Sequence, residues 1–231
     1  MKKVAIMQPY LFPYIGYWQL INAVDVFVIY DDVNFINKGF INRNYILFKN
    51  RSQRFTLELR KASQNKLINE IEIGNNQKKI LKTIEFAYKR APFFDVIFPL
   101  IEELLSWREK NLAKFTTNSL VKVGDFLKIK TKFVVSSNIK KDNSLKRQSK
   151  IIEIVKKLKG DIYINSIGGT SLYNKNDFAR ENIELKFLKP LEIKYKQFNN
   201  EFIPNLSIID TMMFNSPEKI KNEFLEKYEL I

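Results

Sequence analysis

The chain has 231 residues, enough to bury a substantial hydrophobic core, and it carries a formal net charge of +14 at pH 7. It contains neither cysteine nor histidine, which excludes disulfides, thiolate metal sites, cysteine nucleophiles and Ser-His-Asp triads. Any chemistry must therefore use carboxylates, amines, amides, phenols, hydroxyls and backbone groups, or a hard metal ion such as magnesium.

The positive charge indicates a polyanionic partner such as nucleic acid, a nucleotide or a membrane surface. Of the 39 basic residues, 31 are lysine and 8 are arginine. Because abundant Lys, Asn and Ile are typical of AT-rich coding, part of this charge reflects coding bias. Residues 38–66 have a net charge of +7 and residues 128–159 of +9, whereas residues 201–231 have −3. No run approaches the ~18 apolar residues of a membrane span, and we expect a cytoplasmic protein.

The first thirty residues are predicted to form a βαβ unit. Val4–Met7 is an apolar run typical of a buried strand, and Asp25–Tyr30 is β-branched and aromatic, typical of a second one. Between them, Trp18–Ala23 is apolar enough to open a helix. A strand, loop, helix and strand within about 30 residues favour a crossover connection and a parallel sheet.

The middle of the chain is predicted to be mainly helical. Short strands are expected before it, at Asn44–Phe48, Arg54–Leu59 and Leu67–Ile73. The spacing of apolar residues then predicts three helices, at Gln77–Arg90, Phe94–Trp107 and Asn111–Leu127. We therefore expect a helical subregion at about residues 77–128 within a single α/β domain spanning residues 1–231.

The last third returns to strands and helices. Strands are predicted at Phe133–Ser136, Asp161–Ile164 and Glu184–Leu188. Helices are predicted at Ser144–Leu158 with Ser144 as N-cap, at Asp177–Asn182, at Leu206–Phe214, and at Pro217–Lys227 with Ser216 as N-cap. The expected fold is a Rossmann-like, mostly parallel α/β sheet flanked by helices.

The loop from Gln8 to Tyr17 is the first candidate site, because open parallel sheets bind ligands at the carboxyl ends of their strands. Its segment Tyr14-Ile15-Gly16-Tyr17 has the spacing of the H-x-G-H motif of nucleotidylyltransferases, with tyrosine at both histidine positions. Tyrosine can donate a hydrogen bond to a phosphate, but near pH 7 it is a poor proton carrier. The alternative is that these aromatic side chains only pack the helix onto the sheet.

A pair of carboxylates, Asp31 and Asp32, directly follows the second predicted strand, so their side chains are expected to point to opposite sides. One of them would face the ligand crevice while the other caps the loop. Without histidine, such a carboxylate is the leading candidate for a general base. Lys38 and Arg43 further on could bind phosphate or carboxylate. The alternative is a surface loop with a salt bridge.

Two further motifs come after later strands. Asn165 precedes the pair Gly168-Gly169, which allows a ligand to approach the backbone closely or merely forms a tight turn. Asp210 and Asn215 are polar residues within an apolar helix, where they act as caps or support a site. The sequence has no Walker loop, no G-x-G-x-x-G and no metal-binding motif. Residues 38–55 interleave basic and aromatic residues without a known RNA-binding signature.

Taken together, these motifs resemble the WbqC-like family. The resemblance rests on QPY-x-FPY-x-GY, DVFVIYDDV-NF at 25–35, the Arg43-Asn44 pair, YINSIGG-TSLY at 163–173 and LSIIDTMMFN at 206–215. It implies a bacterial transferase of surface-polysaccharide (O-antigen, lipopolysaccharide) biosynthesis. Such an enzyme would add an acyl or aminoacyl group, for example glycine, to the amino group of a nucleotide-linked amino sugar.

This reaction suggests roles for the candidate residues. A basic crevice would hold the nucleotide diphosphate, and Asp32 or Asp31 would take the proton of the attacking amine. The developing oxyanion would be stabilised by Gln8, Tyr10, Asn44 or the Gly168-Gly169 amides. The other candidates for substrate binding are Tyr14, Gly16, Tyr17, Lys38, Arg43, Asn165, Asp210 and Asn215.

The sequence leaves the acyl donor open. An acyl thioester, an aminoacyl-tRNA or other carrier-borne acyl group, and an adenylate made from ATP and Mg²⁺ in the same site all fit. No protein-bound metal site is predicted, and neither is an oligomeric state. Two alternative functions also fit: an adenylate-forming ligase or nucleotidylyltransferase with a degenerate H-x-G-H-like site, and a non-catalytic nucleotide- or RNA-binding protein.

Overall fold

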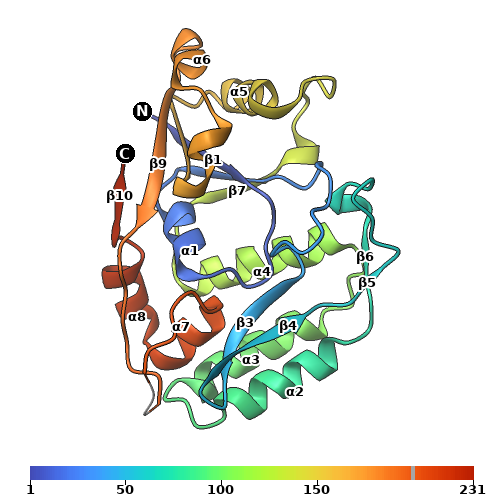
Figure 1. Ribbon diagram of the computed structural model, residues 1–231, viewed down its shortest axis with the longest axis vertical. Coiled ribbons are helices and arrows are strands. Elements are labelled where there is room, and N and C mark those ends of the chain that lie inside the picture. Colours follow the sequence, from blue (N-terminus) through green and yellow to red (C-terminus); the bar gives the residue numbers. More distant parts are fainter. Residues whose placement is uncertain (199–200) are drawn as a thin grey trace.

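A six-stranded sheet organises the protein, whose computed structural model describes residues 1–198 and 201–231 (Figure 1). The strand order is β10-β9-β8-β1-β2-β7, and neighbouring strands are parallel except β9 and β10. The strands are β1 (Lys3–Met7), β2 (Val26–Ile29), β7 (Lys132–Val135), β8 (Ile162–Ser166), β9 (Glu184–Pro190) and β10 (Tyr228–Leu230). The predicted α/β fold with a mostly parallel sheet is confirmed.

The order of the strands changes direction between β1 and β8. The chain moves outward from β1 through β2 to β7 on one side, and then from β8 to β9 and β10 on the other. β1 pairs with β2 over four residues, but its pairing with β8 involves only Lys3 and Val4. In open α/β sheets, ligands bind outside the carboxyl ends of the strands at such a switch point. A ligand is therefore expected to bind at the segments that follow β1, β2, β7 and β8.

The two faces of the sheet pack into separate hydrophobic clusters. On one face, Val4 and Ile6 of β1 pack with α5 (Arg147–Lys157) and α6 (Lys175–Arg180). On the other, Ala5 contributes to a larger cluster that includes Trp18 of α1 (Ile15–Asn22). This alternation is the two-residue period of a strand whose two sides are both covered. In Figure 1, α5 and α6 lie above the sheet while α1 and α4 (Leu112–Phe126) lie below it.

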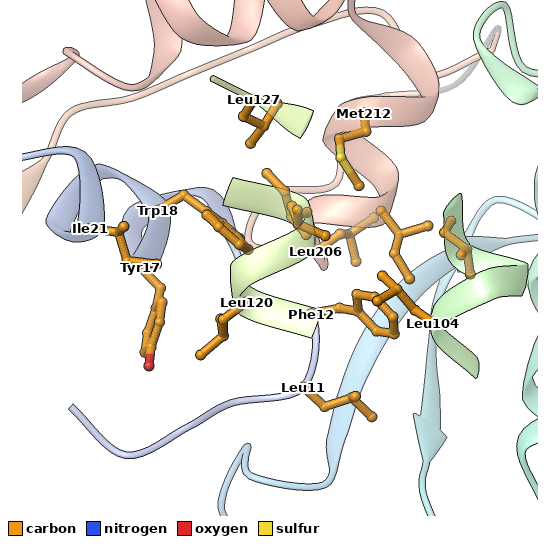
Figure 2. Packing of buried hydrophobic residues seen from close by; sticks show 14 of the residues in the cluster. Leu11, Phe12, Tyr17, Trp18, Ile21, Leu104, Leu120, Leu127, Leu206 and Met212 are labelled. Carbon is orange, nitrogen blue, oxygen red and sulfur yellow. The ribbon is translucent and has the colours of Figure 1, made fainter. Parts of the chain in front are cut away.

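The larger cluster joins the sheet to the helical middle of the chain. Figure 2 shows Phe12 from the loop after β1 beside Leu104, and Trp18 of α1 near Leu120. The three helices predicted between residues 77 and 128 are present as α2 (Gln77–Tyr88), α3 (Phe94–Ser106) and α4. Before these helices in the chain come the antiparallel hairpin of β3 (Arg43–Phe48) and β4 (Arg51–Thr56), and the short antiparallel pair β5 (Leu59–Arg60) and β6 (Glu72–Ile73). The last helices are α7 (Ile208–Phe214) and α8 (Pro217–Lys219).

Two of the predicted elements are shorter than expected, because local turns take up their first residues. Leu67–Ile73 is not one strand, because a 3-10 turn at Ile68–Glu70 precedes β6, and the Glu70 carboxylate closes this turn by accepting from Leu67 N at 2.8 Å. Helix α5 begins at Arg147 and not at Ser144. Ser144 N donates to Asp142 Oδ1 at 2.8 Å, and such a local side-chain bond competes with helix formation.

Contacts distant in sequence override the prediction near the C-terminus, and near the N-terminus one helix begins earlier than predicted. The helix predicted over Pro217–Lys227 is interrupted by a π turn at Ile220–Phe224. Gln19 Nε2 of α1 donates to Phe224 O at 2.8 Å and to Lys227 O at 2.9 Å, and β10 follows and pairs with β9. The predicted N-cap at Ser216 is confirmed, because its Oγ accepts from Lys219 N at 3.2 Å. Helix α1 begins at Ile15, three residues earlier than predicted.

Candidate functional site

A crevice of about 620 Å³ opens where β2 and β7 end, against the beginning of α5. Pockets of this size hold small organic ligands. The segments after the strands contribute Tyr30, Asp32 and Ser137 to its wall. The cations on the wall are Lys141, Lys146, Arg147 and Lys150. These cations belong to the strongly basic segment 128–159, so the uneven charge of the sequence is concentrated at a strand-end cavity.

Asp32 forms the acidic centre of this crevice. Its Oδ2 lies 2.8 Å from Lys141 Nζ and 3.4 Å from Lys150 Nζ. Lys141 is held in place by a further bond to Ser136 O, and its side chain is 2% exposed. Lys150 also lies 5.5 Å from the centre of the Tyr30 ring, within range of a cation–π interaction. The crevice therefore contains a nearly buried carboxylate between two ammonium groups.

The two oxygens of Asp32 are in different situations. Burial raises the pKa of Asp32, but the neighbouring side chains of Lys141, Ser136 and Lys150 together outweigh it and hold this pKa below its usual value. The carboxylate is therefore ionised at neutral pH. Within residues 1–198 and 201–231, its buried Oδ1 has no hydrogen-bond partner. Ser136 Oγ is likewise buried without a partner in the described part of the chain. A ligand N–H or O–H can therefore reach only the part of the Asp32 side chain that is exposed in the crevice, which is 11%.

Asp31, by contrast, is buried, and both of its carboxylate oxygens accept hydrogen bonds from other residues of the protein. It is 3% exposed, and its Oδ1 accepts from Ser137 N at 2.9 Å. Its Oδ2 accepts from Ser137 Oγ at 2.7 Å and from Asn69 Nδ2 at 3.1 Å. These bonds tie the segment after β7 and the turn at Ile68–Glu70 to the end of β2. The adjacent carboxylates thus take the two places expected from strand alternation, with Asp32 in the crevice and Asp31 holding its wall.

The segment after β8 is organised around Asn165. Its Nδ2 donates to Tyr163 OH at 2.6 Å and to Tyr173 OH at 3.2 Å, and its Oδ1 accepts from Ser166 N at 2.7 Å. Gly169 packs closely on this side chain, because a Cβ there would lie 2.9 Å from Asn165 Oδ1. Gly168 has no neighbour within 4 Å of the equivalent position and is exposed. Both glycines lie in a 3-10 turn at Ile167–Leu172, as the tight-turn interpretation expects, and neither has a positive φ.

The loop after β1 is fixed by buried hydrogen bonds. Asn44 Nδ2 donates to Leu11 O at 3.1 Å and to Phe12 O at 2.6 Å, while Asn44 Oδ1 accepts from Tyr45 N at 2.8 Å. Ser207 Oγ also donates to Phe12 O, at 2.8 Å. Phe12 has a φ of 45°, a left-handed conformation that bulky residues adopt only when their surroundings enforce it. Asn44 thus clamps the loop, and its amide is not free for a substrate.

This clamp predicts a stability effect. Replacing Asn44 by alanine is expected to lower the free energy of unfolding by about 2–3 kcal/mol, because buried backbone groups lose their partner. Asn42→Ala is the matched control, since half-buried Asn42 makes one such bond, to Leu57 O at 2.8 Å, and its loss should cost less than about 1 kcal/mol. Urea unfolding of both variants measures the difference, and equal costs would show that Asn44 is no clamp.

The H-x-G-H-like segment does not line the crevice. Tyr17 is buried, and its hydroxyl donates to Gln8 O at 2.7 Å. Gly16 lies under the Tyr14 ring, where a Cβ would come within 2.6 Å of ring atoms. Tyr14 lines a different cavity of about 580 Å³ with Tyr195 and other residues. The packing interpretation therefore describes Tyr17 and Gly16, while half-buried Gln8 remains at the carboxyl edge of the sheet.

The other candidates lie apart from the crevice. Asp210 is buried on α7, and Asn215, at the end of that helix, donates to Thr211 O at 3.0 Å. Arg43 is the first residue of β3, Tyr10 lies beside Phe40 in the segment before that strand, and Lys38 is exposed in the same segment. Sequence reasoning missed several crevice residues, namely Tyr30, Ser137, Lys141, Lys146, Arg147 and Lys150. The signal that could have pointed to the four cations was the +9 charge of residues 128–159.

Comparisons with known proteins place these observations in a family. The model of the WbqC-like protein family matches residues 8–222, which include every motif discussed above. The uncharacterized protein Rv1507c of Mycobacterium tuberculosis (strain ATCC 25618 / H37Rv) is 26% identical over 220 residues, covering 93% of this chain and 94% of that protein. No solved structure matches. In the part of the chain that the structure describes, no helix has the length and apolar character needed to cross a membrane.

Proposed function

The chain belongs to the WbqC-like protein family, and we propose that it transfers an acyl or aminoacyl group to the amino group of a nucleotide-linked amino sugar. The observation that supports this proposal is the crevice whose wall holds four cations and one partly exposed carboxylate, Asp32, which lies between Lys141 and Lys150. We further propose that the reaction belongs to the assembly of a bacterial surface polysaccharide of the O-antigen type, in the cytoplasm, as the family resemblance implies.

The cations of the crevice suit a diphosphate. Lys146 is the N-cap of α5 and Arg147 is the first residue of this 11-residue helix; both are exposed, and the N-cap makes no side-chain hydrogen bond. Free N–H groups and the helix dipole at this end favour an anion, and arginine binds phosphate oxygens through two donors at once. The diphosphate would therefore lie near the beginning of α5, and the sugar would extend toward Asp32.

Asp32 is suited to the amine. Its carboxylate, 11% exposed in the crevice, can accept a hydrogen bond from the sugar amino group and orient the nitrogen lone pair toward an acyl carbon. As the C–N bond forms, the nitrogen becomes acidic, and a carboxylate can take its proton even when its own pKa is low. The bond between the acyl carbon and its carrier then breaks, and the proton leaves with the carrier. This requires an activated acyl donor such as an ester or a thioester.

The adenylate-forming alternative has less support. It needs donors at the Tyr14 and Tyr17 positions to face a nucleoside triphosphate. Tyr17 is buried with its hydroxyl bonded to Gln8 O, and Tyr14 borders a cavity other than the crevice. No geometric observation favours ATP at this segment, so the acyl-transfer proposal does not include adenylation.

The binding half of the proposal has a direct test. Isothermal titration with dTDP-, UDP- and GDP-linked amino sugars is expected to show binding of at least one, and Arg147→Ser or Lys146→Ser should weaken it by about 10- to 100-fold, the effect of losing a charge-assisted phosphate contact. Lys157→Ser is the matched control, because this exposed lysine lies at the other end of α5. Equal affinities of the Arg147 and Lys157 variants would contradict the assignment of the diphosphate.

A further inference from the structure

A row of aromatic rings lies beside the β3–β4 hairpin, outside the crevice. The ring centre of Tyr10 lies 6.1 Å from that of Phe40, which lies 6.5 Å from that of Tyr45. Phe40 is 47% exposed, whereas Tyr10 and Tyr45 are half-buried beside it. A large exposed phenylalanine contributes little to the core. Phe40 therefore presents an apolar ring to solvent, with the half-buried rings of Tyr10 and Tyr45 beside it.

The register of the hairpin places cations next to these rings. Tyr45 is opposite Arg54, and Arg43 is two residues before Tyr45, so all three side chains leave the same face of the hairpin. Arg54 is exposed. Arg43 Nε donates to Gly39 O at 2.8 Å, which holds the loop carrying Phe40 against β3. Lys38, also exposed, lies two residues before Phe40.

The charge of this region is uncompensated. Residues 38–66 contain eight basic residues and one acid, and none of the eight forms a salt bridge within the described part of the chain. The segment also holds four of the eight arginines of the protein. A coding bias toward AT-rich codons accounts for abundant lysine but not for this concentration of arginine. The cluster therefore indicates a polyanionic partner.

We propose that this surface, the hairpin strip of Tyr10, Lys38, Phe40, Arg43, Tyr45 and Arg54, binds single-stranded RNA. An exposed aromatic ring that stacks a base, flanked by cations that hold phosphates, is the combination used by proteins that bind single strands. Arginine adds planar, bidentate contact with phosphate. A membrane surface would require an amphipathic helix or a broad apolar face. Over residues 34–66, the exposed large apolar side chains are Ile36 and Phe40.

This inference goes beyond the proposed acyl transfer and stands without it. The strip ends at Tyr10, three residues after Met7, the last residue of β1, so a bound strand would run toward the carboxyl edge of the sheet. One consequence does rest on the proposed function: the strip would favour an RNA that carries the acyl group as a 3′ ester. The sugar amine would then attack the ester carbonyl, the C–N bond would form, the C–O bond would break, and the RNA hydroxyl would leave with the proton.

Fluorescence anisotropy with the full chain and a labelled single-stranded RNA of about 12 nucleotides tests the strip. Binding is expected to weaken as salt rises, and Phe40→Ala should weaken it by about 5- to 150-fold, the effect of losing one stacked base. Arg54→Ser should weaken it and reduce the slope of log affinity against log salt by about 0.7, since one phosphate contact is lost. Arg108→Ser, which removes another exposed arginine from a different region, should change neither.

The controls separate the sources of a negative result. Circular dichroism melting of each variant shows whether it is folded, and titration with nucleotide-linked sugars reports on the crevice independently of the strip. The inference is overturned if Arg54→Ser and Arg108→Ser behave alike toward RNA, or if vesicles of anionic phosphatidylglycerol bind the protein while RNA does not. If the wild-type protein bound RNA but none of the nucleotide-linked sugars, only the acyl-transfer proposal would be contradicted.

Discussion

Asp32→Asn is expected to slow acyl transfer by about 100- to 10,000-fold, the range over which a positioned acid–base group acts. Asparagine keeps the size of the side chain but cannot take a proton from the attacking amine. The cations at the beginning of α5 remain, so the nucleotide-linked sugar should still bind. The measurement is the turnover number in an assay of amide formation, alongside the dissociation constant of the sugar, and only the turnover number should change greatly.

The neighbouring carboxylate supplies the comparison for this experiment. Asp31→Asn disturbs the bonds to Ser137 and Asn69 and should lower the stability of the crevice wall. It removes no group that faces the substrate, so the folded fraction should retain most of the rate. Asp32→Asn also leaves Lys141 without its carboxylate, which makes a melting curve of each variant necessary. If both asparagine variants retained the wild-type turnover number, Asp32 would have no part in the chemistry.

The pH dependence follows from the lowered pKa of Asp32. Burial raises this pKa, but Lys141, Ser136 and Lys150 together outweigh burial, so the folded-state value lies below the unfolded value of about 3.9. The ion pair therefore stabilises the fold fully above the unfolded pKa, and this contribution is lost as the pH falls through the folded-state pKa. The rate should accordingly show no acid limb from Asp32 above pH ~5. A rate that falls between pH ~7 and ~6 would assign proton transfer to another group.

Sequence patterns predicted the framework of the site because they are local. The period of a strand placed Asp31 and Asp32 on opposite sides, and the βαβ pattern placed both at the carboxyl edge of a parallel sheet. Which of the two faces the crevice depends on Ser137 and Asn69, which lie 106 and 38 residues away in the chain. Such contacts are fixed by tertiary packing and leave no periodic signal in the sequence.

The sequence could not separate functional charges from ordinary surface charges. Among eleven basic residues at 128–159, Lys141 and Lys150 differ from the others only in that the fold buries them against Asp32. The tyrosines of the H-x-G-H-like segment show the opposite case. Their spacing imitates a phosphate-binding motif, yet the Tyr17 hydroxyl is satisfied by Gln8 O within the same loop. A motif read from spacing alone does not reveal which polar atoms remain free.

The largest expected effect on stability is that of Asp210→Ala, about 4 kcal/mol or more. The buried carboxylate accepts from Tyr88 OH at 2.8 Å, Tyr195 OH at 2.7 Å and Gln197 Nε2 at 2.6 Å. Alanine removes three hydrogen bonds to the carboxyl group, each worth about 1.5–3 kcal/mol when that group is charged. The Tyr88 hydroxyl then lacks an acceptor, whereas Tyr195 OH keeps Thr211 Oγ1 at 3.2 Å and Gln197 Nε2 keeps Ile203 O at 3.1 Å. Tyr88→Phe should cost less, about 1–3 kcal/mol. It removes two hydrogen bonds of the Tyr88 hydroxyl, one donated to Asp210 Oδ2 and one accepted from Leu47 N at 2.9 Å.

The pH dependence of this effect distinguishes a buried carboxylate from simple loss of packing. Burial raises the pKa of Asp210, and the bonds from Tyr195, Tyr88 and Gln197 offset only part of that rise. A raised folded-state pKa means that wild-type stability falls as the pH increases from the unfolded pKa through the folded-state value. The alanine variant lacks this titration, so the difference in unfolding free energy between the two proteins should narrow over that interval. Urea unfolding at a series of pH values measures it, and a difference independent of pH would show that Asp210 is ionised equally easily in both states.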